Sequence, residues 1–568
     1  MLIMTKRFFL LLLAIVTVAC KSPLSKPPAV GVVADSGMVV SAHPLASGVG
    51  IKILKAGGNA VDAAVAIQFA LAVVYPSAGN IGGGGFMVMR RKDGFIASLD
   101  YREQAPVSST PDMYLDETGT VIKGLSEKGH LSSGVPGSVA GMFEAHSKYG
   151  SLSWKTIVQP AIDLAKNGFP LTRQQAQSLT DLQDTLKRYN TILPEFLLRD
   201  QWNEGDTIFW KDLGHTLELI RDLGPAGFYS GETADHIVSE MKRGNGLITR
   251  EDLSRYQPVW RKPVTGDYKE YKIISMGPPS SGGIALLQLL NAVERYPFQR
   301  WGNRAAATVH LMTEAQRRVY ADRAAWLGDP DFFTVPVGTL LDKAYAEKRM
   351  KSFHPDRATP SHEIKEGALY FPESLETTHL SVVDPEGNAV AVTTTLNDSF
   401  GAAVVVAGAG FFINDEMDDF SIKAGEPNMY GVTGGEANKI EPRKRMLSSM
   451  TPTIVEREGK LFMVVGTPGG STIITSVFQT LLNVVEFNMT MQQAVSAKRI
   501  HSQWLPDVIY PEKEALAADD SIQLVKMGHH FDSKYWDGIG QVDAILVRPD
   551  GKLEGGADPR GEDTAIGF

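Results

Sequence analysis

The pattern of apolar and polar positions changes about two thirds of the way along the chain of 568 residues. Upstream, residues 61–74 form an Ala/Val-rich apolar run that predicts a buried helix, and residues 308–326 have helical spacing. Short strands interrupt this part at 85–89 and 97–99. From Thr378 onward, apolar and polar residues alternate in HLSVV, AVAVTTT, GAGFFI, TPTIV and KLFMVV, which predicts antiparallel strands.

Helical patterning returns from Ser476, so a helical part is followed by a strand-rich part that also contains helices. This order indicates a layered α+β fold. The segment from Glu363 to Glu376 lies between the two parts and has no strong pattern. We expect it to be exposed.

The first residues have the pattern of an export signal. Lys6 and Arg7 precede an apolar run from Phe8 to Ala19, which is shorter than the roughly 20 residues of a membrane-spanning helix. The run ends in TVAC, which resembles a bacterial lipobox. We therefore expect a signal peptide at 1–19, a lipidated Cys20 with a tether at 20–30, and a membrane-anchored lipoprotein on the periplasmic side of a bacterial cell envelope. A plain signal peptide with an incidental cysteine is the alternative.

Composition excludes several classes of protein. Cys20 is the only cysteine, so neither a disulfide framework nor a cysteine nucleophile within the fold is possible. Lys and Arg number 56 against 65 Asp and Glu, a net charge of −9 that is spread along the chain without a basic stripe. This distribution argues against binding of nucleic acid.

A hairpin brings two threonines together. The turn DPEGN at 384–388 joins the predicted strands 379–383 and 389–395, and with its centre near Glu386 the register places Thr377 opposite Thr395. A threonine at the mouth of a strand, faced by a second hydroxyl, is a candidate nucleophile. A Thr–Thr pair is also ordinary in strands, so register alone leaves both interpretations open.

Longer motifs make the choice clearer. TTHLSVVDPEGNAVAVTTTLNDSFGA, NDEMDDFS, RMLSSMTPTIV and GTPGGS occur in this order, after GGNAVDAAVA, GNIGGGGF, DYREQAP, SGVPGSVAG and PPSSGG. Together they closely resemble the γ-glutamyltranspeptidase (glutathione hydrolase) family of N-terminal-nucleophile hydrolases, from about Gly31 to Phe568. The resemblance implies a four-layer αββα sandwich that self-cleavage divides into a large subunit, 31–376, and a small catalytic subunit, 377–568, which stay together as a heterodimer.

The resemblance also implies how the threonine acts. In the family the precursor cuts itself before the threonine that opens the TTH motif, which here is the bond between Glu376 and Thr377. The new α-amino group, with a pKa of roughly 7.7–8.0, lies close to working pH and supplies the base that a threonine hydroxyl needs. Thr395 matches the threonine that supports the nucleophile by a hydrogen bond.

The remaining site residues are also carried over by resemblance. Gly469 and Gly470 match the oxyanion hole, where bare backbone N–H groups approach closely. The γ-glutamyl carboxylate is expected to bind a forked arginine and two serines, and its ammonium two acids, with an asparagine on the rim. In this order, these residues are Arg102, Ser448, Ser449, Asp419, Glu416 and Asn397. The Gly/Pro/Asn-rich loop 423–438, with Tyr430 as its large aromatic, looks like the lid over the donor pocket.

Other motifs do not support a cofactor or a metal. GNIGGGGF lacks the strand and acidic residue of a dinucleotide fold, and His362-Glu363 is followed by Glu366 where a zinc-binding HExxH motif needs histidine. His529 and His530 stand without further ligands. We therefore expect neither cofactor nor metal.

The expected activity is cleavage of γ-glutamyl amide bonds. Donors would be glutathione and other γ-glutamyl compounds, and acceptors water, amino acids or peptides. An acylase of the same fold, acting on glutaryl-cephalosporins or poly-γ-glutamate, is the nearest alternative. Arg102 with Asp419 and Glu416 speaks against the glutaryl substrate, which has no α-amine. An inactive binding lipoprotein is a further alternative, which the intact motifs disfavour.

Overall fold

The computed structural model describes residues 30–364, 377–423, 435–532 and 536–568. Two seven-stranded antiparallel sheets form its centre. The first has the order β1 (Val32–Ala34), β17 (Leu553–Gly556), β16 (Asp543–Val547), β13 (Lys460–Gly466), β12 (Thr453–Arg457), β9 (Tyr271–Ser275), β8 (Val264–Tyr268). The second has the order β18 (Thr564–Gly567), β2 (Met38–Ser41), β10 (Thr378–Val383), β11 (Ala389–Thr395), β3 (Gly84–Arg90), β4 (Ile96–Asp100), β7 (Val259–Arg261).

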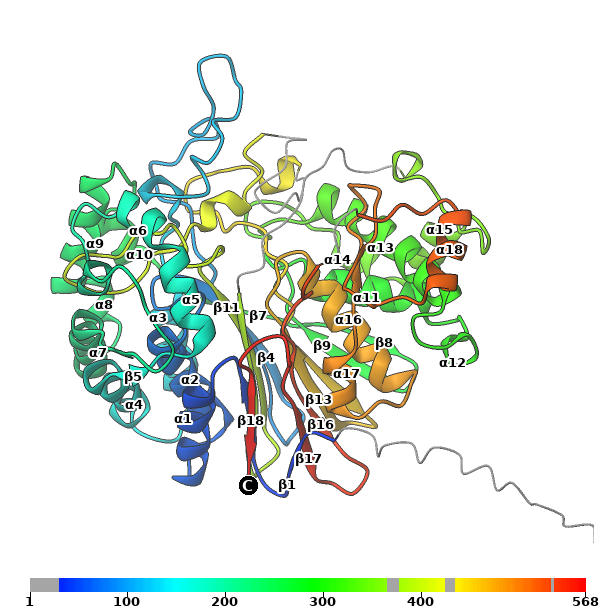
Figure 1. The fold of residues 1–568 in the computed structure, drawn as a ribbon, viewed down its shortest axis with the longest axis horizontal. Coiled ribbons are helices and arrows are strands. Elements are labelled where there is room, and N and C mark those ends of the chain that lie inside the picture. Colours follow the sequence, from blue (N-terminus) through cyan, green and yellow to red (C-terminus); the bar gives the residue numbers. More distant parts are fainter. Residues whose placement is uncertain (1–29, 365–376, 424–434, 533–535) are drawn as a thin grey trace, which may run out of the picture.

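Helices cover the outer face of each sheet. Figure 1 shows α1 to α10 on one side of the two sheets and α11 to α18 on the other. Helix α2 (Ala60–Val74) contacts β10 and β11, whereas α11 (Gly282–Val293) contacts β8 and β9, and α16 (Thr472–Val485) contacts β13. The order of layers is therefore helix, sheet, sheet, helix, which confirms the αββα sandwich.

The central strands are buried on both faces because each sheet lies between its partner sheet and a helical layer. All residues of β10 and β11 are buried. One side chain set packs between the sheets, including Val40, Val88, Ala391 and Val464, and the other packs under the helices. Successive side chains along these strands therefore point alternately into two apolar environments, and neither of these is solvent.

Helix α2 forms as its apolar run predicts. Every one of its 15 residues is buried, so it has no polar face. Asn59 and Asp62 form a reciprocal capping box at its first turn, and Asp62 also accepts hydrogen bonds from Ser151. The long predicted helix downstream is α13 (Ala306–Trp326), which contacts α11 in the outer layer of the first sheet.

No helix within the described residues is both long and apolar enough to cross a membrane.

The remaining elements connect these layers. The other helices are α1 (Pro44–Lys55), α3 (Ser138–Tyr149), α4 (Trp154–Asn167), α5 (Arg173–Asp181), α6 (Gln183–Tyr189), α7 (Lys211–Leu223), α8 (Ala226–Tyr229), α9 (Gly231–Arg243), α10 (Arg250–Arg255), α12 (Phe298–Trp301), α14 (Val337–Leu340), α15 (Lys343–Met350), α17 (Met491–Ser496) and α18 (Ala518–Lys526). Two small sheets pair β5 (Phe169–Pro170) with β6 (Thr207–Ile208) and β14 (Ile500–His501) with β15 (Tyr510–Pro511).

The strand predictions are confirmed with one exception. HLSVV, AVAVTTT, TPTIV and KLFMVV correspond to β10, β11, β12 and β13. The GAGFFI segment at 408–413 is wrong as a strand: only Phe412 and Ile413 make isolated bridges, to Val405 and Gly82. Gly408 and Gly410 have φ angles of 81° and 75°, left-handed conformations that turn the chain away from an extended ladder.

The strand-poor appearance of the first part is also misleading. Strands β1, β2, β3, β4, β7, β8 and β9 all precede residue 377, and in both sheets some of them pair directly with later strands, as β2 does with β10 and β9 with β12. A cut before Thr377 would therefore leave two chains that share both sheets. The segment 365–376, which contains Glu376, lies outside the described residues, as do Cys20 and the tether up to residue 29.

Candidate active site

Thr377 lies at the mouth of strand β10. The observed register pairs Thr378 with Thr394 and His379 with Thr393, so it continues to Thr377 opposite Thr395, as the hairpin predicts. The Thr377 side chain is largely buried, with 6% of its surface exposed. Hairpin geometry thus places two hydroxyl residues at one end of the sheet.

The chain after β11 bends sharply at Asn397. Its φ of 80° is a left-handed conformation that is uncommon for a residue other than glycine. The Asn397 N–H donates to Thr395 Oγ1 at 2.8 Å, and its side-chain amide donates to the Asp415 carbonyl at 3.1 Å. The next residue, Asp398, is held by an ion pair, because Lys128 Nζ lies 2.7 Å from its Oδ2. After this bend, Asn397 lines the same cavity as Thr377.

Gly469 and Gly470 form the turn between β13 and α16. Their φ angles are 128° and 51°, in the region where glycine is favoured. A Cβ on Gly469 would lie 2.4 Å from Thr472 Oγ1, so a larger residue does not fit. Because α16 begins at Thr472, its N-terminal partial positive charge also lies beside this turn. These features suit stabilisation of an oxyanion.

Arg102 stands at the centre of an acidic cluster. Its two terminal nitrogens donate to Glu416 and Asp419, which lie on the short 3-10 helix Glu416–Asp419. A third carboxylate, Glu103, lies 3.6 Å from the Arg102 guanidinium. The groups predicted to hold the two charges of an amino acid are thus paired with each other in this structure.

Burial controls the protonation of this cluster. It raises the pKa of Glu416 well above its usual range, although the Arg102 charge opposes the shift, and it raises the pKa of Asp419 in the same way. Burial likewise raises the pKa of Glu103 to about 7. For Arg102, burial disfavours the charge, but the neighbouring carboxylates outweigh it and the pKa rises. Three carboxyl groups lie beside a single guanidinium, so the cluster can accept the positive charge of a ligand as well.

A second arginine, which sequence reasoning missed, holds the segment of Ser448 and Ser449, called the serine loop below. Arg323 of α13 donates from Nη2 to Ser449 Oγ at 2.9 Å and from Nε to Ser281 Oγ at 2.9 Å. Ser281 in turn donates from its backbone and its hydroxyl to the Ser448 carbonyl, at 2.7 and 2.6 Å. The sequence offered no signal for this role, because α13 carries several charged residues, including Arg317 and Arg318, and helical spacing does not distinguish Arg323 from them.

One cavity collects the predicted groups from distant parts of the sequence. Gly469 does not line the cavity itself, but its neighbour Gly470 does. Tyr430 lies outside the described residues, so its predicted role in a lid stays a prediction. The lining residues are Arg102, Arg323, Thr377, Thr395, Asn397, Glu416, Asp419, Ser448, Ser449, Met450, Gly470 and Ile473.

His379 does not belong to this cavity. It is fully buried, with Nδ1 2.9 Å from Thr393 Oγ1 and Nε2 3.1 Å from Ser381 Oγ. Burial lowers the pKa of the imidazole to about 3, so it stays neutral at physiological pH. This histidine therefore has a structural role.

A candidate nucleophile at the mouth of a buried strand, in a sandwich of two sheets between helices, defines the class of N-terminal-nucleophile hydrolases. The family model of gamma-glutamyltranspeptidase matches residues 46–568. The chain belongs to the gamma-glutamyltranspeptidase family.

Curated relatives agree over nearly the full length. The chain is 47% identical over 538 residues to a glutathione hydrolase proenzyme from Pseudomonas sp. (strain A14), with 93% of each chain covered. It is 44% identical over 578 residues to the glutathione hydrolase proenzyme of Escherichia coli (strain K12), with 98% of each covered.

Solved structures resemble the fold. A cephalosporin acylase from Bacillus halodurans superposes with a TM-score of 0.82 at 27% identity, covering 97% of this chain and 99% of that chain. The gamma-glutamyltranspeptidase of Helicobacter pylori superposes with a TM-score of 0.56 at 46% identity, covering 60% of this chain and 96% of that chain.

Proposed function

We propose that the chain is a self-processing γ-glutamyltransferase and glutathione hydrolase. The observation that carries this proposal is the single cavity in which Thr377 meets Arg102, Asp419 and Ser449. A nucleophile and a site for an α-amino acid head group are thereby combined. An enzyme that acylates Thr377 with the distal carboxyl of a glutamyl group needs both.

Processing would begin with Thr377 itself. Its Oγ attacks the carbonyl carbon of Glu376, the C–N bond breaks, and the amide nitrogen leaves as the α-amine of Thr377 while an ester forms to Oγ. Water then hydrolyses the ester. The products are chains 31–376 and 377–568, and the shared sheets support their association as a heterodimer.

The new α-amine then serves as base. With a pKa of roughly 7.7–8.0 it takes the proton of Oγ as Oγ attacks the γ-carbonyl of the donor, and it returns this proton to the departing amine. The oxyanion in each tetrahedral intermediate would be stabilised by the backbone N–H groups at Gly469 and Gly470, each typically worth about 10²–10³ in rate. Water or a second amine finally takes the acyl group from Thr377.

Head-group recognition would separate the pairs that now neutralise each other. The donor carboxylate would receive hydrogen bonds from Arg102, supported by the Ser448 and Ser449 hydroxyls, and its ammonium would replace the arginine beside Glu416 and Asp419. A site of this kind rejects analogues that lack one group by roughly 10⁴–10⁵. We therefore expect selectivity for the γ-glutamyl end.

An acylase activity is the second candidate, favoured by the structural similarity to the cephalosporin acylase. Glutaryl and γ-glutamyl anilides differ only in the α-amine, so their kcat/KM ratio decides between the candidates. The three carboxylates of Glu103, Glu416 and Asp419 predict that the γ-glutamyl anilide is preferred. Preference for the glutaryl anilide would favour the acylase.

We also propose that Cys20 is diacylated and anchors the enzyme on the periplasmic side of the cell envelope, with 1–19 removed as a signal peptide. The lipobox-like TVAC supports this proposal. Labelling cells with a palmitate analogue should mark the wild type but not Cys20→Ser. An unlabelled wild type would leave only the plain signal peptide.

The decisive experiment is mass analysis of the purified mature protein together with a γ-glutamyl anilide assay. Two chains, one starting at Thr377, and release of the aniline are expected. Thr377→Ala should remain one chain and be inactive. An uncut chain that still turns over the anilide would overturn the mechanism, because no α-amine would then exist at Thr377.

A further inference from the structure

The glycine-rich segment 79–86, GNIGGGGF, takes no part in the proposed chemistry, but it contacts the strand that carries Thr395. The segment follows α2 and leads into β3, so it belongs to the part of the chain before residue 377. Strand β3 pairs with β11, and Gly84 lies opposite Thr395 in their register. The segment therefore reaches the end of the strand that carries the predicted partner of the nucleophile.

Two of these glycines allow the backbone to lie directly against the site. A Cβ on Gly83 would overlap the Thr395 carbonyl oxygen, and a Cβ on Gly84 would overlap the Glu103 carboxylate. Glu103 is the neighbour of Arg102, so the segment packs at once against the nucleophile side and the head-group side of the candidate active site. Only glycine lets a backbone approach its neighbours this closely.

The side chain of Asn80 joins this segment to the end of β11. Its Nδ2 donates to the Thr395 carbonyl oxygen at 2.8 Å and to Thr394 Oγ1 at 3.1 Å. Thr394 Oγ1 in turn donates to the Gly84 carbonyl oxygen at 2.7 Å. Because Asn80 precedes residue 377 and both threonines follow it, these hydrogen bonds would link the two chains of the processed enzyme.

The orientation of this amide is fixed from its other side. Asn80 Oδ1 accepts from the Gly83 N–H at 3.1 Å and from Ser138 Oγ at 2.6 Å. Only the amide oxygen can accept these bonds, so the donating Nδ2 must face β11. Asn80 is buried, with 5% of its surface exposed, so water has little access to replace a hydrogen bond that is lost.

The backbone that Asn80 holds determines where the Thr395 hydroxyl can reach. Thr395 Oγ1 accepts from the Asn397 N–H at 2.8 Å, and a hydroxyl oxygen can accept one hydrogen bond while it donates another. Thr377 and Thr395 line the same cavity, and the register of β10 and β11 continues to place them opposite each other. A shift of the end of β11 would therefore move the supporting hydroxyl relative to Thr377.

A different asparagine holds the head-group side. Asn414 Oδ1 accepts from the Glu416 N–H at 3.1 Å and from the Gly134 N–H at 2.8 Å. Its Nδ2 donates to the Gly82 carbonyl oxygen at 2.9 Å, on the same glycine-rich segment. The hydrogen bonds of Asn80 are instead directed to β11, to Ser138 and to its own segment. The two asparagines thus support different halves of the site.

We propose that Asn80 is a positioning residue for the nucleophile, which holds the end of β11 and, through it, the Thr395 hydroxyl beside Thr377. The inference rests on the proposed function. Loss of the Asn80 donor should slow the attack by Thr377 Oγ, both in self-cleavage and in acyl transfer, because alignment of the attacking group is lost. Binding of the donor head group should not weaken, since Asn80 does not hold the groups that bind it.

Asn80→Asp is the test, because it keeps the shape and the accepting Oδ1 but replaces the donating Nδ2 by an oxygen. Asn190→Asp is the matched control. Asn190 is also 5% exposed, and its Nδ2 donates to the carbonyl oxygens of Leu186 and Ala403, at 2.7 and 2.8 Å, so it too links the parts before and after residue 377. Self-cleavage is followed by mass analysis, kcat and KM with a γ-glutamyl anilide on the processed enzyme, and stability by the melting temperature.

For Asn80→Asp, kcat and the rate of self-cleavage should each fall about tenfold, the effect of one or two lost hydrogen bonds, whereas KM should stay within about twofold of wild type. Asn190→Asp should lower the melting temperature to a similar extent but keep all three kinetic values within about twofold. A wild-type kcat in Asn80→Asp, or equal kcat losses in the two variants, would overturn the inference. A wild type that neither cleaves itself nor turns over the anilide would instead overturn the proposed function.

Thr394→Val keeps the inference testable if Asn80→Asp does not fold. Valine has nearly the shape of threonine, but it removes the hydroxyl that accepts from Asn80 and donates to Gly84, while Thr395 stays in place. We expect kcat to fall about threefold with an unchanged KM, the effect of one neutral hydrogen bond. An unchanged kcat in this variant would also overturn the inference.

Discussion

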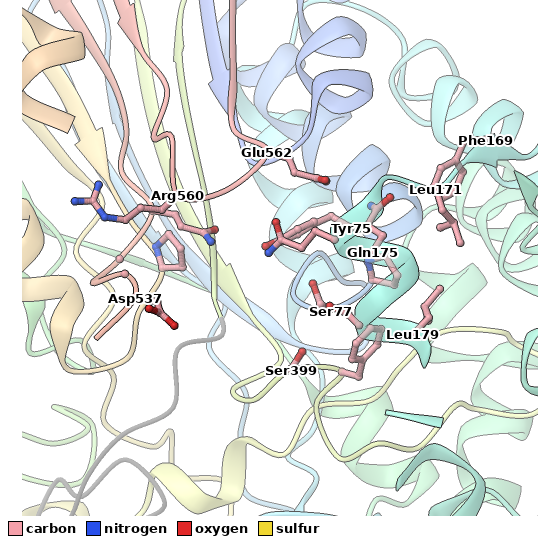
Figure 2. Close-up of a pocket in the computed structure, with 18 of the residues that line it drawn as sticks. Tyr75, Ser77, Phe169, Leu171, Gln175, Leu179, Ser399, Asp537, Arg560 and Glu562 are labelled. Atoms are coloured by element: carbon pink, nitrogen blue, oxygen red, sulfur yellow. The ribbon is translucent and has the colours of Figure 1, made fainter. Parts of the chain in front are cut away.

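Two cavities lie on either side of the loops 395–400 and 467–470, and they differ in almost every physical respect. The first, the cavity of the candidate active site, encloses only about 20 Å³ and is crowded with charges that neutralise each other. The second encloses about 300 Å³ between a mainly apolar wall, with Tyr75 and Leu179, and a C-terminal wall, with Asp537, Arg560 and Glu562 (Figure 2). Selectivity follows from this contrast. A ligand of the first cavity must separate paired charges, so only a head group whose own charges replace both partners binds well. An apolar wall accepts many side chains of similar size.

Replacing Arg102 should produce the largest loss. Arg102→Lys keeps a charge but removes the planar fork that can bind a carboxylate with two parallel hydrogen bonds. Losing charge-assisted bonds of this kind costs about 3 kcal/mol, so kcat/KM for a γ-glutamyl anilide should fall about 100-fold. Steady-state kinetics on the processed enzyme checks this. A loss confined to kcat, with KM unchanged, would contradict the role in head-group binding.

Replacing Arg323 should act more weakly and through the serine loop. Arg323→Lys cannot reach Ser281 and Ser449 together, so Ser449 loses a fixed orientation. We expect KM for the anilide to rise about tenfold with kcat nearly unchanged, the effect of about 1.4 kcal/mol of lost ground-state binding. A matched fall in kcat with constant KM would show that Arg323 acts on the transition state instead.

A smaller change is expected in the second cavity. Trp210→Phe keeps an apolar ring in the wall of this cavity but removes the indole N–H, which has no acceptor among the described residues. Steady-state kcat and KM for the γ-glutamyl anilide should change by less than about threefold, because no described residue lines both cavities and one neutral hydrogen bond is worth about 0.5–1.5 kcal/mol. A change of about tenfold or more would erase the distinction between the cavities.

The weakest expected effect on activity concerns Asp563, beside the second cavity's C-terminal wall. Burial, with the charge of Asp558, raises the pKa of Asp563 to about 7. Because the folded state then holds a proton that the unfolded state releases near pH 4, the free energy of unfolding should fall as pH rises from about 4 to about 7.

Asp563→Asn should remove this contribution, which reaches at most about 1.4 kcal/mol per pH unit for one group. Urea unfolding midpoints between pH 4 and pH 7, measured in the Thr377→Ala background, check the slope. Identical slopes with and without the substitution would show that Asp563 does not titrate in this range. Activity of the processed enzyme at pH 7 should be unaffected.

Sequence reasoning worked best where geometry is local. The hairpin turn at 384–388 determined the register, and with it Thr395 opposite Thr377, because strand pairing across a short loop has little freedom. It failed at 408–413, where apolar residues fill the core from a chain bent by Gly408 and Gly410. Apolar composition reports burial, but it does not report backbone direction.

Arg323 shows a second limit. Nothing in the spacing of residues 308–326 separates a surface arginine from one that reaches Ser281 and Ser449, since helical periodicity is indifferent to which neighbour a face meets. The second cavity is invisible for the same reason. Its lining residues come from segments as far apart as Tyr75 and Glu562, and they meet only when the two sheets are assembled.

The sequence by itself determined the family motifs, the candidate nucleophile and its partner, because these depend on residue identity and on short-range register. Only the tertiary structure decided that Arg102 rests against its own acids, that Arg323 holds the serine loop, and that a second cavity adjoins the first. Those outcomes depend on burial and on distances between segments far apart in the chain. Electrostatic and packing energies act across space, and a linear pattern does not record them.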